Sequence, residues 1–273
     1  RKFGVLRYNS NGTLDTSFNT AGTVTTLLNS SAMAYAVTIQ TDGLIVVGGT
    51  SYGGPPYAYA LARYLTNGSL DTSFATQGWI TPGAIPGPAS IRALELQPDG
   101  KILAAGYGTP ATVARFSIAR FNTDGTLDTS FYTSGARLGP VIGTGVAPSE
   151  IAYGLALQTN GRIVLGGTVG GTSEFGMARF LTDGNMDTSF NTTGTLRLSI
   201  FTSAFAGALR IQTNGQIVAS GGRGTPSNPL GFVAARFNTN GTLDTSFNTT
   251  GTATAIPGAG SGGQPPAPRS RYS

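Results

Sequence analysis

The sequence contains no cysteine and no histidine, and only 11% of its 273 residues are charged. These absences exclude a zinc finger, a thiol redox centre, a Cys-His or Ser-His-Asp nucleophile and an imidazole acid or base. They also exclude disulfide bonds as a source of stability. Because most familiar catalytic mechanisms need one of these groups, we expect no enzymatic activity. The hydrophobic fraction of 39% is nevertheless sufficient for a folded core.

Clustered positive charge and long apolar runs are also missing. The net charge of +5 comes from 17 basic residues spread over the chain, and the densest clusters are only Arg1 with Lys2 and Arg269 with Arg271. Nucleic-acid binding needs lysines and arginines gathered on one face, so we expect no nucleic-acid partner. Apolar runs such as 44–47 fall far short of the roughly 20 residues of a membrane-spanning helix. We therefore expect no membrane span.

What the sequence does contain is a tandem repeat. The block Leu14-Asp15-Thr16-Ser17-Phe18 returns four times, once with methionine in place of leucine, and its aspartates lie 56, 57, 59 and 57 residues apart. An arginine followed by an aromatic residue stands eight residues before each aspartate, and a glycine stands seven residues after it. A second motif, Gln-x-Asp/Asn-Gly followed by an apolar run and glycine, occurs four times, at Gln40, Gln97, Gln158 and Gln212.

The sequence pattern within each repeat unit predicts four short strands. The first, such as 36–40, ends at an Asp-Gly or Asn-Gly pair, which is a strong hairpin signal. The second, such as 44–47, is a continuous apolar run typical of a strand buried on both faces. The third carries the arginine, as in 59–64, and the fourth follows the Asp-Thr-Ser-Phe block, as in 195–200. An all-β fold results, a β-propeller of four-stranded antiparallel blades with about 57 residues each.

The strand count predicts an unclosed ring. The chain begins with a third and a fourth strand, at 3–8 and 23–28, and continues with four complete units, which makes 18 strands. The ring is then either five-bladed, with one blade completed from elsewhere, or four-bladed with extra strands. We assign residues 1–256 to the propeller and the Gly/Pro-rich residues 257–273 to a C-terminal arm or linker. Since the first residue is arginine, we expect a processed chain or part of a longer one.

The two motifs together resemble a known repeat. The block Arg-aromatic-x-x-Asn/Asp-Gly-x-Leu-Asp-Thr-Ser-Phe, joined to Gln-x-Asp-Gly-x-Ile-x-x-x-Gly, is similar to the delta-60 repeat of bacterial β-propellers. The resemblance covers residues 3 to about 256. It implies the propeller fold and carries over no general activity.

The repeated arginine and aspartate predict an ion pair at the corner of each unit. Residues eight apart face each other across a hairpin with a three-residue loop. Because every unit has the pair, we interpret it as structural; the alternative is a ring of five ligand-binding arginines. The pairs are Arg7 and Asp15, Arg63 and Asp71, Arg120 and Asp128, Arg179 and Asp187, and Arg236 and Asp244.

Metal and acid sites find little support in the sequence. The turn Asn122-x-Asp124-Gly125-x-x-Asp128 places oxygens at alternating positions, which is an alternative reading as a calcium loop. It fails the EF-hand spacing, so we predict no cofactor, with Ca²⁺ as the alternative. The acids outside the repeat, Glu95, Glu150 and Glu174, fall at different positions of different units. No pair of carboxylates for glycoside hydrolysis is therefore indicated.

Two further sets of residues are candidate sites. Six Asn-x-Ser/Thr sequons are candidate glycosylation sites, which matter only where the source glycosylates exported proteins. They lie at Asn11, Asn29, Asn67, Asn191, Asn240 and Asn248. Aromatic residues outside the repeat pattern are candidate ligand contacts, or alternatively packing between blades: Tyr52, Tyr57, Trp79, Tyr107, Tyr132 and Tyr153.

From these features we predict a non-catalytic structural or adhesive propeller that is secreted or on the cell surface. The low charge and the abundance of Thr, Ser, Asn and Gly are typical of a protein outside the cell. Unpaired strand edges favour self-association or binding to another surface protein, for example as a subunit of a filament assembled head to tail. The alternative is a carbohydrate- or protein-binding module of a larger surface protein.

Overall fold

The computed structural model describes residues 1–143, 149–170, 174–199, 204–225 and 228–256. Within them the chain is all-β, with eighteen strands in one two-stranded and four four-stranded antiparallel sheets. The predicted propeller blades are confirmed. Residues 257–273, predicted to be an arm or linker, lie outside the described residues. No helix in the described ranges has the length and apolarity that a bilayer crossing requires.

The first sheet is a half-blade, and each later sheet is one repeat unit with its strands in chain order from one edge to the other. The half-blade comprises β1 (Phe3–Leu6) and β2 (Thr23–Thr26). Blade 1 comprises β3 (Ala32–Ile39), β4 (Ile45–Ser51), β5 (Ala58–Tyr64) and β6 (Trp79–Ile80), and blade 2 comprises β7 (Ala89–Leu96), β8 (Ile102–Gly108), β9 (Arg115–Phe121) and β10 (Ala136–Leu138). Blade 3 comprises β11 (Ile151–Leu157), β12 (Ile163–Val169), β13 (Glu174–Phe180) and β14 (Thr195–Leu198), and blade 4 comprises β15 (Ala204–Ile211), β16 (Ile217–Thr225), β17 (Asn228–Phe237) and β18 (Thr252–Ala255).

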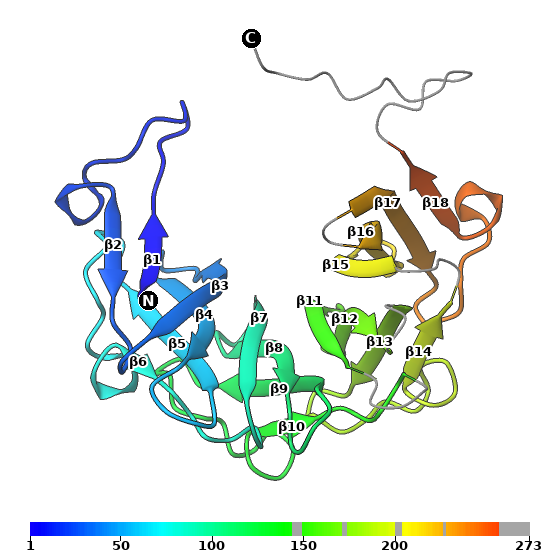
Figure 1. The fold of residues 1–273 in the computed structure, drawn as a ribbon, viewed down its shortest axis with the longest axis horizontal. Coiled ribbons are helices and arrows are strands. Elements are labelled where there is room, and N and C mark those ends of the chain that lie inside the picture. The colour runs from blue at the N-terminus through cyan, green and yellow to red at the C-terminus, as the bar shows by residue number, and fades with distance from the viewer. Residues whose placement is uncertain (144–148, 171–173, 200–203, 226–227, 257–273) are drawn as a thin grey trace.

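The blades form an open arc (Figure 1). The first strand of each complete blade, β3, β7, β11 or β15, lies on the concave side, and the last strand lies on the outside. The half-blade and blade 4 stand at the two ends, facing each other across the opening. The described chain therefore has the predicted four complete units and one half unit, arranged as an arc and not as a closed ring.

The hydrophobic cores lie between neighbouring blades. The second strands of blades 1 to 3 are buried along almost all of their length, and every residue of β4 is buried. One core joins blades 1 and 2, where Leu61 and Phe74 pack with Ile91 and Phe121. Each Å² of apolar surface that is buried contributes about 25 cal/mol to the free energy of folding. The apolar contacts between blades are therefore the main source of stability. The arrangement explains why the second strand reads as a continuous apolar run.

The concave strands are longer than the sequence predicts. β3 begins at Ala32, whereas the apolar alternation predicts a strand that begins only at residue 36. A β-bulge interrupts the register between Ala34 and Ala36, and a bulge of the same kind occurs in β7, β11 and β15. The extra residue of a bulge breaks the period-two pattern, so the pattern identifies only the part of the strand that follows it.

Candidate functional site

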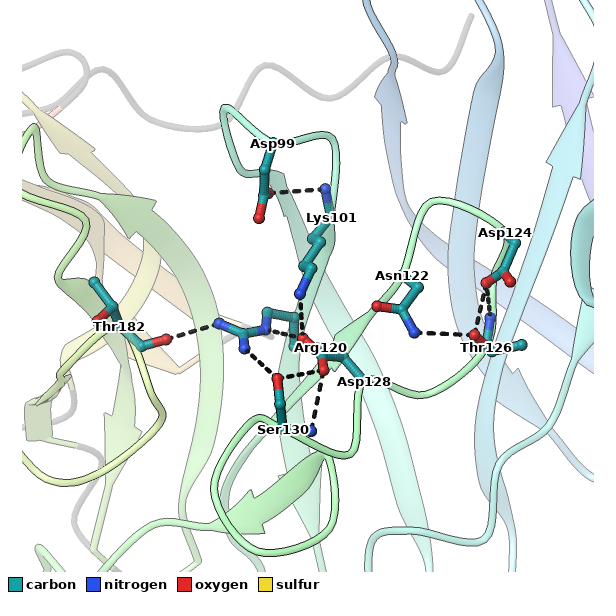
Figure 2. Close-up of polar contacts among 9 residues, drawn as sticks. All are labelled: Asp99, Lys101, Arg120, Asn122, Asp124, Thr126, Asp128, Ser130 and Thr182. Atoms are coloured by element: carbon teal, nitrogen blue, oxygen red, sulfur yellow. Dashed lines mark hydrogen bonds and ion pairs between the residues drawn. The ribbon is translucent and has the colours of Figure 1, made fainter.

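In blade 2 the repeated arginine holds the blade corner and reaches into the next blade (Figure 2). In blade 2, Arg120 Nε donates to Asp128 Oδ2 at 2.7 Å, and Nη2 donates to Ser130 Oγ at 3.3 Å. Its Nη1 donates to the carbonyl oxygen of Thr182, in blade 3, at 2.7 Å. The guanidinium carbon also lies 4.7 Å from the ring centroid of Phe131. One side chain therefore links the two strands of a corner, the following turn and the neighbouring blade.

The other four corners have the same ion pair. The Nε to Oδ2 distances are 2.7 Å for Arg7 and Asp15, 2.6 Å for Arg63 and Asp71, 2.7 Å for Arg179 and Asp187, and 2.6 Å for Arg236 and Asp244. Two pairs have a further cation, with Lys101 Nζ 2.8 Å from Asp128 and Arg162 Nε 3.1 Å from Asp187. With each arginine bound to an aspartate, a serine and an aromatic ring, the geometry favours the structural interpretation over a ring of ligand-binding arginines.

The corner carboxylates stay ionised. Burial of Asp128 acts to raise its pKa, but hydrogen bonds from Lys101, Ser130 and Arg120 outweigh burial and lower the pKa well below its ordinary value. The same opposition of burial and hydrogen bonding lowers the pKa of Asp71 and of Asp187. The charge of each corner arginine is thus matched inside the fold, and little of it remains to attract a ligand.

A different set of residues lies on the concave side, at the bulges of the first strands. The extra residue stands between the shifted register pairs of each strand: Tyr35 in β3, Arg92 in β7, Tyr153 in β11 and Gly207 in β15. At these positions the backbone repeats from blade to blade while the side chain changes. Bulges re-aim side chains and are frequent beside functional sites. The concave bulges are therefore where one repeat scaffold presents different chemistry in each blade.

Arg92 lies at the centre of a cluster of tyrosines from blades 1 and 2. Its guanidinium carbon is 3.8 Å from the ring centroid of Tyr35 and 5.7 Å from that of Tyr107. The hydroxyls of Tyr35 and Tyr52 are 3.4 Å apart. The rings of Tyr52 and Tyr57 pack edge to face, with centroids 4.7 Å apart and planes at 64°. We call these five residues the Arg92 cluster.

The guanidinium of Arg92 differs from those of the corner arginines at its Nε, which binds no carboxylate in the described ranges. Its Nε is buried and has no hydrogen-bond partner among the described residues, and in the same ranges no carboxylate pairs with it. The hydrogen bond with Tyr35 and burial together raise the pKa of the Tyr52 hydroxyl, so it stays neutral and can donate. The cluster offers a cation, aromatic faces and hydroxyls in one place. Such a combination suits a ligand with both an apolar ring face and a negatively charged group.

A second polar feature involves the same row of first strands. A cavity of about 330 Å³ is lined by Glu95, Ala156, Leu157, Arg210 and Ile211, from β7, β11 and β15. Burial raises the pKa of Glu95, and the charge of Arg210 partly opposes this shift. This cavity adds one acidic and one basic group to the concave side.

The two remaining acids outside the repeat hold the structure locally. Glu150 is fully buried and accepts the backbone N–H groups of Ile142 at 2.5 Å and Gly143 at 2.8 Å. Glu174 pairs with Arg197 and accepts the Ser199 hydroxyl at 2.7 Å. Within the described ranges, no group of three or more acidic residues could hold a metal ion.

Of the six aromatic residues predicted as ligand contacts, the structure brings three together. Tyr52, Tyr57 and Tyr107 belong to the Arg92 cluster, whereas Tyr153 lies exposed at the β11 bulge. The other two are elsewhere: Tyr132 stacks on Arg137 at 4.3 Å, and Trp79 packs against the core between the half-blade and blade 1. Sequence reasoning missed Tyr35 and Arg92. A signal was present, because both stand five residues before the repeated glutamine, where the units differ.

The predicted glycosylation asparagines fall into two groups. Asn11, Asn67 and Asn240 are exposed in the corner turns, where their side-chain oxygens accept the backbone N–H two residues on. Asn29, Asn191 and Asn248 instead donate their side-chain amides to Ser51, Thr195 and Thr252. A sugar would be attached most easily at the first group, because its amide nitrogens make fewer contacts.

Solved structures with low sequence identity are similar to this chain. A protein of unknown function from Dyadobacter fermentans is 13% identical, with a TM-score of 0.53, and the match covers 86% of this chain and 67% of that one. A gluconolactonase of Xanthomonas campestris is 18% identical, with a TM-score of 0.42 and coverage of 81% and 64%. The native arabinanase of Bacillus subtilis is 10% identical, with a TM-score of 0.41 and coverage of 80% and 77%. The chain spans about two thirds of the length of the first two.

These structures correct two predictions. At such identities the likeness shows the fold and assigns no activity to this chain. Blades in this arrangement nevertheless occur in proteins named as gluconolactonase, ulvan lyase and arabinanase, so the predictions of no enzymatic activity and of a non-catalytic structural or adhesive role are wrong. The physical reason is that missing histidine and cysteine exclude only the mechanisms that need them. The alternative, a carbohydrate- or protein-binding propeller, agrees better with these findings.

The family is shown by the repeats themselves. No curated protein matches the chain. The family described as "Domain of unknown function (DUF5122) beta-propeller" matches residues 1–18, 40–74, 97–131, 158–190 and 212–247, which is more than half of the chain. The matched segments carry the arginine, the aspartate block and the glutamine motif. The chain belongs to the DUF5122 β-propeller family.

Proposed function

We propose that the protein binds an acidic saccharide on its concave side, at the Arg92 cluster. The observation that carries this proposal is the guanidinium of Arg92, which lies against the Tyr35 ring and has a buried Nε without a partner in the described ranges. A saccharide carboxylate fits the planar donors of arginine in a bidentate manner. The tyrosines supply ring faces for the sugar and hydroxyls for its oxygens.

The energetics favour a charged over a neutral sugar. A buried donor without a partner costs about 1–3 kcal/mol, and a bound carboxylate would recover part of this cost. Because Arg92 already lies between tyrosine rings, its side chain loses little additional freedom when the ligand binds. A neutral sugar could use the rings but would leave the guanidinium uncompensated. We therefore expect the protein to prefer uronate-containing saccharides.

Further groups that could contact a sugar lie on the concave side beyond the Arg92 cluster. The exposed Tyr153 lies at the β11 bulge in the next blade, and the cavity lined by Glu95 and Arg210 extends from β7 across β11 to β15. An extended ligand would pass from the Arg92 cluster across β11 toward β15 (Figure 1). An oligosaccharide should therefore bind more tightly than a monosaccharide.

Titration calorimetry with an oligogalacturonate and a neutral oligogalactan of equal length tests the proposal. Wild-type protein should prefer the acidic ligand, and Arg92→Ala should weaken its binding by about tenfold or more, which corresponds to about 1.4 kcal/mol. Arg137→Ala is the matched control, because Arg137 also stacks on a tyrosine but lies outside the cluster. Chromatography of the ligand after incubation reports whether it is cleaved.

Aromatic substitutions give a second comparison. Tyr57 and Tyr132 are similarly exposed, at 46% and 40%, so Tyr57→Ala and Tyr132→Ala should perturb folding equally. Only Tyr57→Ala should weaken saccharide binding. Equal binding of acidic and neutral ligands, or full binding by Arg92→Ala, would contradict the proposed role of the cluster.

We also propose that the repeats are of the delta-60 type and that the protein acts outside the cell, secreted or on the surface. The long repeat block supports the first statement, and the low charge with abundant Thr, Ser, Asn and Gly supports the second. Immunoblots of medium, surface and cytosolic fractions from the source cells test the location. Detection in the cytosol alone would contradict it.

A further inference from the structure

The contact between neighbouring blades has a turn on one side and a socket on the other. In blade 3, the turn at Thr182, Asp183 and Gly184 inserts against the corner of blade 2. The Thr182 carbonyl accepts Arg120 Nη1, and the Asp183 carbonyl accepts the backbone N–H of Tyr132 at 2.6 Å. Gly184 lies over the ring of Phe131, so close that a Cβ would be only 2.9 Å from it. Polar and apolar contacts thus fix the turn in its socket.

The same junction occurs between every neighbouring pair of sheets in the described chain. The backbone hydrogen bonds from socket to turn are Asn19 to Asn67 at 2.7 Å, Ala75 to Asp124 at 2.7 Å, Tyr132 to Asp183 at 2.6 Å and Asn191 to Asn240 at 2.8 Å. The socket phenylalanines are all fully buried: Phe18, Phe74, Phe131 and Phe190. Because the four junctions have the same contacts, they show which groups of a turn a socket binds.

Blade 4 carries a fifth socket that no described residue fills. Arg236 donates to Asp244 and, at 3.1 Å, to Ser246, but in the described ranges its Nη1 has no acceptor. Asn248 has the same left-handed φ of 48° as Asn19, yet no described carbonyl accepts its N–H. Phe247 is partly exposed, whereas its four counterparts are buried. The socket is formed and its donors are available.

The half-blade carries a fifth turn that touches no described socket. Gly12 has a φ of +82°, like its counterparts, but nothing lies within 4 Å of the position of its Cβ. The residues beside this turn are exposed as well, with Leu6 at 55% and Tyr8 at 59%. Their counterparts in the complete blades, for example Ala119 and Phe121, are fully buried against the preceding blade. This end of the arc therefore presents the surface that a socket covers elsewhere.

Apolar surface complements the polar contacts at the blade 4 end. A groove of about 600 Å³ on this blade is lined mostly by apolar and glycine residues, among them Val233, Ala234 and Ala255. Phe232, at its rim, is 66% exposed. On the other blades the next blade covers the corresponding face; in blade 3, for instance, Gly166 faces Leu209 of blade 4. The groove continues a kind of interface that the fold already uses.

We propose that a second copy of the chain docks its half-blade on blade 4. The Ser10 carbonyl accepts Arg236 Nη1, the Asn11 carbonyl accepts the N–H of Asn248, and Gly12 covers Phe247. Leu6 and Tyr8 pack toward the apolar groove. Within the described chain the two surfaces stand on opposite sides of the opening of the arc (Figure 1), so they do not meet there, and the half-blade of a second copy carries the turn that fits the socket. The contact is heterologous, because turn and socket are different surfaces.

Analytical ultracentrifugation of single variants and their mixture tests this docking. Tyr8→Arg places a charge on the turn surface, and Phe232→Arg places one at the rim of the groove; both residues are exposed, so the monomer should keep its fold. Val141→Arg, also at an exposed site, is the control. We expect wild type and the control to form dimers and larger species with rising concentration, and each single variant to stay monomeric.

Mixing the two variants tests whether the turn of one copy docks on the socket of another. Tyr8→Arg keeps an intact socket and Phe232→Arg keeps an intact turn, so mixing them should give a one-to-one dimer that grows no further. Wild-type protein that stays monomeric at every concentration would overturn the proposal. So would association that neither variant disrupts, or a mixture that remains monomeric while the wild type associates.

Discussion

The corners and the bulges of this molecule are equally repetitive in backbone and opposite in sequence. At the corners, the same arginine, aspartate, serine and phenylalanine make the same contacts in blade after blade. At the bulges, the register shift recurs while the residue changes between Tyr35, Arg92, Tyr153 and Gly207. In this repeat protein, the residues that stay the same in every blade hold the fold together. The residues that vary at a constant backbone position indicate where a ligand binds.

Among the substitutions considered, we expect the loss of a buried corner arginine to lower the stability most. Arg179 has only 3% of its side chain exposed, against 35% for Arg7. Arg179→Ala leaves the buried carboxylate of Asp187 short of its main partner and should lower the free energy of unfolding by about 3 kcal/mol. Arg7→Ala should cost about 1 kcal/mol or less, because solvent screens that pair. Urea denaturation measures both, and equal losses would show that the corners do not act through burial.

The turn glycines separate backbone strain from contact between blades. Gly241 and Gly12 have φ values of +90° and +82°, so alanine strains the backbone equally at either position. At Gly241 the new Cβ would also lie 2.6 Å from the Phe190 ring, whereas at Gly12 it meets nothing. Gly241→Ala should therefore cost about 2 kcal/mol more than Gly12→Ala in urea denaturation. Similar costs would mean that the turn is not seated on the ring.

Acid titration tests the charge state of the corners. The folded-state pKa of Asp128 lies below that of an unfolded aspartate, which is about 3.9. Its contribution is therefore fully present above the unfolded pKa and is lost as the pH falls toward the folded pKa. We expect the stability of the wild type to fall steeply below about pH 4, and that of Asp128→Asn to fall less steeply. Parallel curves from urea unfolding at each pH would contradict this assignment.

We expect substitution at a bulge to have the smallest effect on stability. Arg92→Ala removes a stacking contact with Tyr35 but also a buried Nε that has no partner among the described residues, so the two changes oppose each other. The free energy of unfolding should change by about 0.5 kcal/mol or less in thermal or urea denaturation. A loss as large as that of Arg179→Ala would place Arg92 among the residues that hold the scaffold.

The blades can be predicted from the sequence because the residues that form their turns, strands and ion pairs recur in every repeat. The Asp-Gly turns, the apolar second strands and the Arg-Asp spacing each depend on local geometry, so they identify blades without the structure. The strand count predicts that the ring does not close, but it leaves the number of blades open, and the arrangement as an arc depends on how the blades pack. The bulges were missed, since Tyr35 and Arg92 break the alternation that identifies a strand.

The candidate site was predicted only in part. Tyr52, Tyr57 and Tyr107 stand out in the sequence because they lie outside the repeat pattern. Their meeting around Arg92 depends on two blades packing side by side, and such contacts between distant segments leave no periodic signal. Arg92 itself looks like one more scattered basic residue in the sequence, and only the structure shows that no carboxylate of the described ranges pairs with it.

A crystal structure of the protein with a bound oligogalacturonate tests the central claim most directly. The account predicts a ligand carboxylate within hydrogen-bond distance of the Arg92 guanidinium and a sugar ring against the tyrosines of the cluster, with the corner arginines unchanged. A saccharide bound at the corner turns, with Arg92 still free of ligand, would contradict it.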